Sequence, residues 1–493
     1  MHTLTLDDLL DGAERILDDA PITITHGLGP TQFYRHGWTS WSPTGWTPLD
    51  ESPLRIHGDP DRLQTADDAA NDRADRHEGS AVGALALPDG RVLLLGALGL
   101  GTPRVGASTT ELWGSVESDG DGWFAVVGEE SIVFARYAAL LRERLGTPPA
   151  ATVTRLWCSW YSYFEDIDAR TLTGAIDDLA ALPLAAPLDV VQVDDGWEQI
   201  VGDWEPNPKF ADGLAPIARQ VAANGSRPGL WLAPFIALPG SRVAIEHPDW
   251  LVRDEAGAPL LAGHNWNAHY FALDTTHPEV REHLRSVFAQ VTEWGFRYLK
   301  LDFLYAGALR GARHLDLPRE RVYREAIALI REVVGPDVYL LGCGAPMIPS
   351  VGILDGVRVG PDTAADWAYP ASAADPSHEG GLNGVVSSVE RLWMRDLYQV
   401  DPDVAFFRSD RTTLTSEQKR TIVDVAAVTG FRSTSDPVAW LAEDERAALV
   451  AFLDADPQIE RLGRYRYAID SRAVDFTPAI REARLGRERL GRE

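Results

Sequence analysis

The chain has 493 residues, a formal net charge of −27 from 46 basic and 73 acidic side chains, and 45% hydrophobic residues. These values are typical of a globular protein with two to four domains, and the acidic balance excludes nucleic acid and anionic membrane surfaces as expected partners. Two cysteines exclude a disulfide scaffold and a multi-cysteine metal site.

Residues 1–148 are expected to form a β-sandwich-like domain. Short apolar runs separated by Gly, Asp and Pro turn signals predict strands at 81–87, 91–100, 110–116 and 122–128. The polar stretch 57–80 predicts an exposed loop, and 135–145 has the pattern of a helix. The Gly146-Thr147-Pro148-Pro149 break then predicts a linker.

Strand-like runs alternate with amphipathic helices over 151–455. Strands are predicted at 154–162, 188–194, 228–234, 297–303, 338–344, 357–362, 404–409 and 430–436. Helices are predicted at 168–181, 210–224, 278–293, 317–334, 386–399, 415–428 and 440–453. Eight such units match a (β/α)8 TIM barrel. A doubly wound open sheet is the alternative, but no G-x-G-x-x-G sequence follows the first strand.

The remaining segment, 456–493, is short, and its arginine-rich end predicts a frayed or exposed helix.

The acidic N-terminus lacks the features of a signal peptide, and no stretch approaches the ~20 apolar residues that span a bilayer. With so few cysteines, a cytoplasmic protein is expected.

Functional residues of a barrel lie at the C-terminal ends of its strands. The predicted strand ends carry Trp231, Asp194 with Asp195, Lys300 with Asp302, Cys343 with Gly344, and Arg358 with Asp362. Such carboxylates fit either a catalytic pair for glycoside chemistry or a metal site. The glycosidase is favoured because the histidines His247, His264, His269 and His277 fall between the third and fourth strands and not at strand ends.

Several of these residues also have structural interpretations. Asp302 could cap a helix, but Lys300 lies two residues before it, so both side chains face the same side of the strand, where they are costly unless paired or functional. Asp194 and Asp195 point in opposite directions unless the chain turns. Cys343 and Trp231 alone would be core residues, and Arg358 alone a carboxylate partner.

Several segments resemble glycoside hydrolase family 36, in the clan that also holds the family 27 α-galactosidases. The matching segments are GWTSWSP (37–43), VVQVDDGWEQIVGDWEPNPKFADGL (190–214), RPGLWLAPF (227–235), KLDFLYAGA (300–308), GCGAP (342–346), RVGPDTAADW (358–367), VDPDVAFFRSD (400–410) and SDP (435–437). They occur in family order. The chain departs from the family in its short N-terminal domain and in the few residues after the barrel.

The resemblance implies a double displacement with Asp302 as nucleophile and Asp362 as acid/base. It implies that Lys300 and Arg358 contact the sugar and that Asp194 and Asp195 accept hydrogen bonds from O4 and O6 of galactose. Trp231 would line the site, Cys343 and Gly344 would lie near the 2-position, and Trp38 of the N-terminal domain would reach the barrel mouth.

The implied function is a retaining exo-α-galactosidase that removes terminal α-linked galactose from oligosaccharides such as melibiose or raffinose through a covalent glycosyl-enzyme. No metal or other cofactor is implied, and a homo-oligomer is a candidate assembly. The alternatives on the same scaffold are an α-N-acetylgalactosaminidase and a raffinose-synthase-like galactosyl transferase. The alternative from another class is a catalytically inactive sugar-binding protein.

Overall fold

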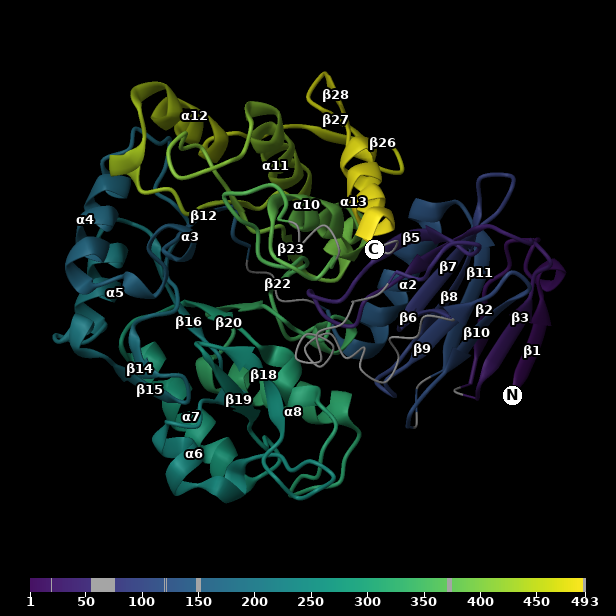
Figure 1. Ribbon diagram of the computed structural model, residues 1–493, viewed down its shortest axis with the longest axis horizontal. Helices are drawn as coiled ribbons and strands as arrows, with labels where there is room; N and C mark the ends of the chain where they lie inside the picture. Colours follow the sequence, from purple (N-terminus) through teal and green to yellow (C-terminus); the bar gives the residue numbers. More distant parts are fainter. Residues whose placement is uncertain are drawn as a thin grey trace.

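The computed structural model describes residues 1–18, 20–54, 76–118, 120, 122–147, 152–369 and 375–490. Two stacked β-sheets built from the N-terminal third lie beside a larger body of parallel strands and helices (Figure 1). The last strands and helix pack on that larger body and approach the N-terminal sheets.

The N-terminal part is a β-sandwich, as the pattern of short apolar runs predicted. One sheet has the order β1 (His2–Thr5), β3 (Ile22–Thr25), β10 (Glu111–Ser115), β9 (Arg104–Ala107) and β6 (His77–Ser80). The other has the order β2 (Arg15–Leu17), β11 (Trp123–Gly128), β8 (Val92–Ala97), β7 (Val82–Ala86), β4 (Gln32–Arg35) and β5 (Gly45–Pro48).

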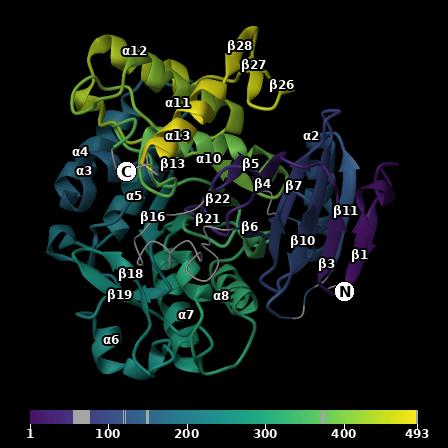
Figure 2. The same cartoon turned by 45° about the vertical axis from the view of Figure 1, so that its right-hand side comes forward.

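Strand β8 shows why the sandwich attaches firmly to the rest of the chain. Its residues Leu93 and Leu95 belong to the core between the two sheets, whereas Val92 and Leu94 belong to the large core shared with the barrel. Successive side chains of a strand point to opposite faces, so an uninterrupted apolar run marks a strand buried on both sides. Helix α2 (Glu130–Leu145) covers this second face (Figure 2).

Two connecting segments were predicted without regular structure. Residues 55–75, most of the predicted 57–80 loop, lie outside the described residues, and His77–Ser80 are not loop but form β6. This edge strand pairs antiparallel with β9. Of the predicted linker, Pro148 and Pro149 also lie outside the described residues.

All eight predicted barrel strands are present in one parallel sheet. In chain order they are β12 (Arg155–Cys158), β13 (Val190–Val193), β16 (Arg227–Leu232), β20 (Tyr298–Leu301), β21 (Tyr339–Gly342), β22 (Gly356–Arg358), β23 (Gln399–Asp401) continued by β24 (Val404–Ala405), and β25 (Arg432–Thr434). Strands β23 and β24 occupy the two ends of the sheet, but only two residues separate them along the chain. The sheet therefore closes into a (β/α)8 barrel, and the open doubly wound sheet is excluded.

The helices follow the strands in the alternating order that the sequence predicted. The main ones are α4 (Ala169–Ala180), α5 (Ala215–Ala223), α7 (Pro278–Glu293), α8 (Arg319–Val334), α10 (Gly381–Glu390), α11 (Ser416–Thr429) and α12 (Glu443–Leu453). Shorter elements at the barrel mouth are α3 (Trp160–Tyr163), β14 (Glu198–Ile200), β15 (Asp203–Pro206), β17 (Ile236–Ala237), α6 (Arg242–Glu246), β18 (Leu261–Asn265) and β19 (Ala268–Ala272). The predicted helix 386–399 is misplaced, since α10 begins at Gly381 and ends at Glu390.

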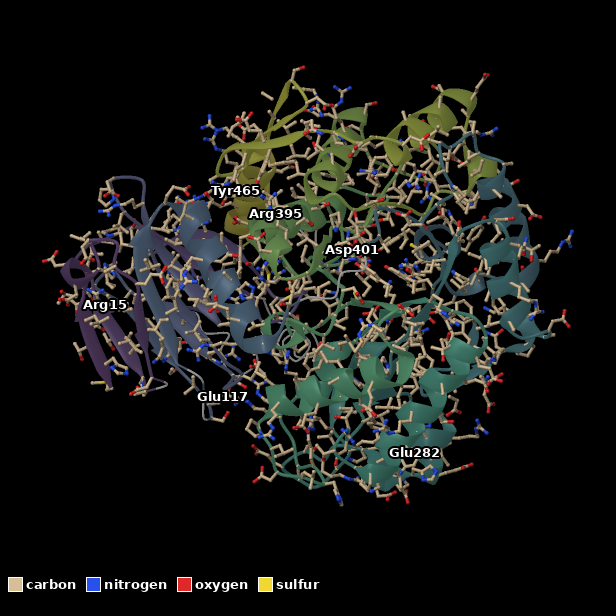
Figure 3. All side chains as sticks on the ribbon, turned by 180° about the vertical axis from the view of Figure 1, so that it is seen from behind. Arg15, Glu117, Glu282, Arg395, Asp401 and Tyr465 are labelled. Atoms are coloured by element: carbon tan, nitrogen blue, oxygen red, sulfur yellow. The ribbon has the colours of Figure 1, made fainter. Side chains whose placement is uncertain are left out.

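The segment after the barrel has more structure than predicted. Strands β26 (Ile459–Gly463), β27 (Arg466–Ile469) and β28 (Arg472–Asp475) form an antiparallel sheet, and α13 (Thr477–Leu490) follows. Helix α13 was expected to be frayed or exposed, but Ala479 and Ala483 are buried where it packs on α10. Tyr465, in the turn between β26 and β27, lies where this sheet meets the sandwich side of the barrel (Figure 3).

Candidate active site

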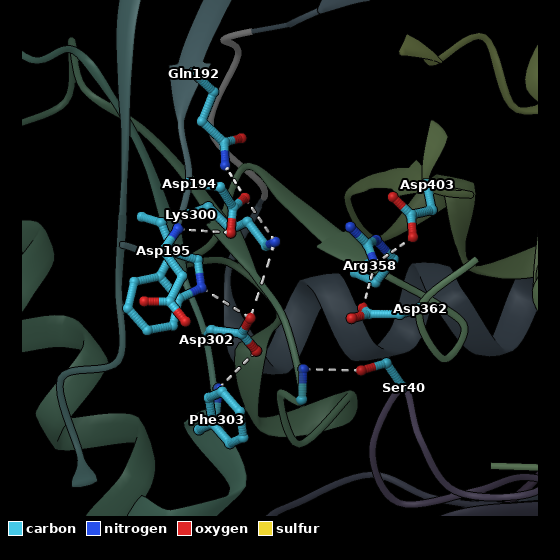
Figure 4. A network of polar contacts seen from close by, with 12 residues as sticks. Ser40, Gln192, Asp194, Asp195, Lys300, Asp302, Phe303, Arg358, Asp362 and Asp403 are labelled. Atoms are coloured by element: carbon cyan, nitrogen blue, oxygen red, sulfur yellow. Dashed lines mark hydrogen bonds and ion pairs between the residues drawn. The ribbon is translucent and has the colours of Figure 1, made fainter. Parts of the chain in front are cut away.

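Two carboxylates face one another across the C-terminal end of the barrel (Figure 4). Asp302 directly follows β20, and Asp362 lies four residues beyond the end of β22. The Asp302 side chain is 10% exposed, whereas that of Asp362 is 37% exposed. One carboxylate is thus enclosed in the barrel and the other lies at its open mouth.

The Asp302 carboxylate is held in one orientation. Trp231 Nε1 donates to Oδ2 at 3.0 Å, and the backbone N–H of Phe303 donates to Oδ1 at 2.8 Å. Phe303 has a φ of +52°, which is unusual for an aromatic residue. Burial raises the pKa of Asp302 above its ordinary value, while Lys300, opposed by the charge of Asp362, acts to lower it.

Lys300 bridges two carboxylates, Asp194 after strand β13 and Asp302 after its own strand β20. Its Nζ lies 3.0 Å from Asp194 Oδ2 and 3.9 Å from Asp302 Oδ2. Gln192 Nε2 also donates to Asp194 Oδ2, at 2.6 Å. Burial alone would lower the pKa of Lys300, but the charges of Asp194 and Asp302 outweigh it and keep the group a cation. The expected pairing of Lys300 and Asp302 on one strand face is therefore present.

Asp195 has different partners from its neighbour Asp194. Trp266 Nε1 donates to Asp195 Oδ2 at 2.8 Å, and Glu198 at the start of β14 lies beside it. Burial and the neighbouring Glu198 carboxyl raise the pKa of Asp195 to about 9, so the pair retains a proton at neutral pH.

Arg358 holds the second carboxylate of the pair. Its Nη1 lies 3.0 Å from Asp362 Oδ1 and 2.8 Å from Asp403 Oδ2, and its Nε lies 3.3 Å from Asp401 Oδ2. Burial acts to lower the pKa of Arg358, but the charge of Asp403 and its other acidic neighbours raise it well above the ordinary value. The guanidinium is therefore a permanent cation beside Asp362.

Four aromatic rings from separate segments form a wall beside Asp302. Trp266, in the tight turn between β18 and β19, lies 5.2 Å from Phe303 and 6.3 Å from Trp231 between ring centroids. Trp41 of the N-terminal sandwich lies 5.3 Å from Phe303. Trp41, Trp266 and Phe303 are partly exposed, so their rings are available to a bound ligand.

The structure places Trp38 away from this wall. Trp38 is 2% exposed and its Nε1 donates to Glu320 Oε1 of α8 at 3.0 Å. Its loop is nevertheless docked on the site, because the backbone N–H of Gly344 donates to Ser40 Oγ at 2.9 Å. The tryptophan that reaches the site from this loop is Trp41, three residues later.

Cys343 and Gly344 lie at the wall behind the two carboxylates. Cys343 is fully buried, and burial together with the nearby Asp302 raises the pKa of its thiol well above the ordinary value. Gly344 has a φ of +57°, and a Cβ there would lie 2.9 Å from the Trp41 ring. Any larger residue at 344 would displace Trp41.

The structure thus brings together every residue predicted for the site except Trp38. The prediction missed Trp41, Trp266, Phe303, Glu198 and Asp403 as site residues; Glu198 begins the short strand β14, and the other four lie outside the helices and strands given above. Within the described ranges, no group of three or more His, Cys, Asp or Glu residues is arranged to hold a metal ion. An enclosed, oriented carboxylate opposite an exposed one suits nucleophilic attack and proton transfer on a glycoside.

Comparisons with known proteins agree with this chemistry. The family described as Melibiase matches residues 129–333. An α-galactosidase from Thermus thermophilus, solved in complex with p-nitrophenyl α-D-galactopyranoside, is 41% identical with a TM-score of 0.87, and the match covers 95% of each chain. A structure of the same enzyme in complex with stachyose matches 86% of this chain and 91% of that chain, at a TM-score of 0.80 and 41% identity.

More distant relatives are larger proteins. The fold is shared with a GH36 α-galactosidase, AgaA, from Geobacillus stearothermophilus, at 17% identity and a TM-score of 0.60 over 87% of this chain and 61% of that one. Alpha-galactosidase 2 of Pediococcus pentosaceus is 30% identical over 142 residues, which are 27% of this chain and 19% of that protein. The matches to several curated relatives span between about a fifth and two fifths of the length of the relative.

Proposed function

The chain belongs to the glycoside hydrolase family 36 α-galactosidases, and from this premise we propose how its residues release terminal α-linked galactose from oligosaccharides. The observation that carries the proposal is that Asp302 and Asp362 face each other across the barrel mouth. Two N–H donors hold Asp302, and Arg358 holds Asp362. It supports a retaining double displacement.

In the first step, an Asp302 oxygen attacks the anomeric carbon while Asp362 gives a proton to the leaving glycosidic oxygen. The bond from the anomeric carbon to that oxygen breaks, and galactose is left as an ester of Asp302. In the second step, Asp362 takes a proton from water, the water oxygen attacks the anomeric carbon, and Asp302 leaves as a carboxylate. The N–H of Trp231 and the ammonium of Lys300 stabilise this departing charge.

The sugar itself is proposed to lie between the two Asp residues that follow strand β13 and the aromatic wall. Asp194 and Asp195 take the O4 and O6 hydroxyls, and Trp231 faces the ring. Cys343 and Gly344 are proposed to lie near the 2-position, where the wall that Gly344 forms with the Trp41 ring would distinguish a hydroxyl from a larger substituent.

The first-formed sugar tests this mechanism. Hydrolysis of p-nitrophenyl α-galactoside followed by proton NMR is expected to give α-galactose first, with the β anomer appearing only by mutarotation. Initial release of β-galactose would overturn the double displacement.

We also propose that no cofactor takes part, so that dialysis against EDTA leaves the rate unchanged; a loss restored by a divalent cation would contradict this.

The part of the chain described contains no helix long and apolar enough to cross a membrane. Its two cysteines, Cys158 and Cys343, are buried and unpaired. From these unpaired cysteines we infer a cytoplasmic location, to be checked by cell fractionation. Self-association stays a prediction, and light scattering after gel filtration measures it.

A further inference from the structure

Asp403 is the centre of a buried hydrogen-bond cluster next to the proposed acid/base. Its Oδ2 accepts from Arg358 Nη1 at 2.8 Å, from the backbone N–H of Thr363 at 2.8 Å, and from the hydroxyl of Tyr161. These donors come from three segments: strand β22, the loop that follows it, and α3. The side chain of Asp403 is 1% exposed.

The backbone at Asp403 is strained and firmly held. Its φ is +78°, in the left-handed region that non-glycine residues rarely occupy, and it lies in the two-residue break between β23 and β24. Its N–H donates to Asp401 Oδ1 at 2.8 Å, and its carbonyl accepts from Ser433 Oγ at 2.7 Å. Interruptions of this kind re-aim one side chain, and such strain is typical of functional positions.

Two of the three groups that Asp403 holds also determine where Asp362 lies. Arg358 Nη1 donates to Asp362 Oδ1 at 3.0 Å, and Thr363 is the residue next to Asp362 in the chain. Asp362 itself lies on a loop with a partly exposed side chain, so its position depends on these neighbours. Asp403 therefore restrains Asp362 from its side-chain end and from its backbone.

The ionisation of Asp403 fits this arrangement. Burial raises the pKa of Asp403 to about 6, against the opposing effect of the Arg358 cation. At neutral pH the group is therefore mainly a carboxylate, which accepts all three hydrogen bonds. Its Oδ1 is buried and has no hydrogen-bond partner among the described residues, so Oδ2 carries the whole cluster.

We propose that Asp403 is a positioning residue for proton transfer: by holding Arg358 and the Thr363 amide, it aims the Asp362 carboxyl at the glycosidic oxygen. This inference rests on the proposed function, in which Asp362 is the acid/base. It differs from a purely structural role, because a structural defect would impair all substrates alike, whereas a misplaced acid impairs only those that need a proton on the leaving group.

The test compares Asp403→Asn with Asp362→Ala on two substrates, melibiose and an aryl α-galactoside with a strongly acidic leaving group. We expect kcat/KM of Asp403→Asn to fall at least about tenfold more on melibiose than on the aryl substrate, as for Asp362→Ala. The double variant is expected to lose no more on melibiose than Asp362→Ala alone. The ratio between substrates is measured on one sample, so it does not depend on the folded fraction.

Asp355→Asn is the matched control. Asp355 is as buried as Asp403 and also accepts from an arginine and from a backbone N–H, but these belong to Arg331 and Leu340 and not to the groups that place Asp362. Its losses are expected to be similar on both substrates. If Asp403→Asn yields no soluble protein, Tyr161→Phe takes its place, because it removes one of the three hydrogen-bond donors to Asp403. Its loss of kcat/KM is also expected to be greater on melibiose than on the aryl substrate, but by a smaller factor.

The outcomes separate the two levels of the proposal. The positioning role alone would be overturned if Asp362→Ala lost more activity on melibiose than on the aryl substrate but Asp403→Asn lost equally on both. Equal losses for Tyr161→Phe, used in place of Asp403→Asn, would count in the same way. Absence of a split in Asp362→Ala would overturn the proposed acid/base assignment and the inference with it.

Discussion

Glu390 offers a quantitative test of how the three parts of the chain are joined. It is the last residue of α10, is 6% exposed, and its Oε1 accepts from the hydroxyl of Tyr465 at 2.7 Å. The hydroxyl of Tyr34, from the sandwich strand β4, donates to its backbone carbonyl at 3.0 Å. Glu390 thus lies where barrel, sandwich and C-terminal sheet meet.

Burial raises the pKa of Glu390 from 4.5 to about 7, although the Tyr465 hydrogen bond and the Arg464 cation act to lower it. The folded protein therefore keeps a proton that the unfolded chain releases, and stability falls as pH rises from about 4.5 to about 7. At 1.36 kcal/mol per pKa unit, the loss above pH 7 is about 3 kcal/mol, an order-of-magnitude value for this site.

The variant Glu390→Gln removes the titration and can still accept the Tyr465 hydrogen bond. Its free energy of unfolding, relative to the parent protein, is expected to rise by about 3 kcal/mol between about pH 4.5 and about pH 8. Urea denaturation followed by circular dichroism at several pH values measures this difference. The control is Glu143→Gln, which removes a carboxylate whose side chain is 65% exposed instead of one at this buried junction. A flat difference for Glu390→Gln would refute the reasoning.

Three substitutions test the site, and a fourth, Trp38→Phe, is the comparison for one of them. Lys300→Met removes a cation 3.0 Å from Asp194 and should lower kcat/KM on an aryl α-galactoside by about 100-fold or more; a loss below tenfold would contradict its role. Trp266→Phe keeps a ring but removes the N–H that donates to Asp195, so the inhibition constant of galactose should rise about tenfold, and an unchanged constant would show that this bond does not organise the site. Trp41→Ala should impair oligosaccharide hydrolysis more than Trp38→Phe, whose ring lies outside the wall; the reverse order would contradict the placement of these rings.

The barrel could be predicted because its strands are short apolar runs that end in polar residues. The Lys300 and Asp302 pair was also recognisable, since a spacing of two puts both side chains on one strand face. Closure of the sheet into a barrel was harder to predict from the sequence, because the strand that closes it is interrupted at Asp403.

Helix α10 was misplaced for a physical reason. Its first turns contain Gly381 and Gly384, which are poor helix formers. A Cβ at Gly381 would lie 3.1 Å from the Trp367 ring, so the close packing of this helix selects glycine against helix propensity. Tertiary contacts of this kind are not encoded in local periodicity.

The aromatic wall could not be predicted for a similar reason. Trp266 lies in a turn with a φ of +50°. Trp266 and Trp41 both contact Phe303 only because three distant segments converge. In the sequence GWTSWSP, Trp38 and Trp41 are equivalent candidates. The choice between them depends on the Glu320 acceptor, which takes the indole N–H of Trp38 into the interior.

The nucleophilic role of Asp302 is the central claim, and azide rescue tests it most directly. Asp302→Ala assayed on an activated aryl α-galactoside is expected to lose nearly all activity and to recover with azide, because azide enters the space left by the carboxylate and attacks the anomeric carbon. The predicted product is β-galactosyl azide. Activity like that of the parent protein without azide, or recovery that gives the α-galactosyl azide, would contradict the assignment.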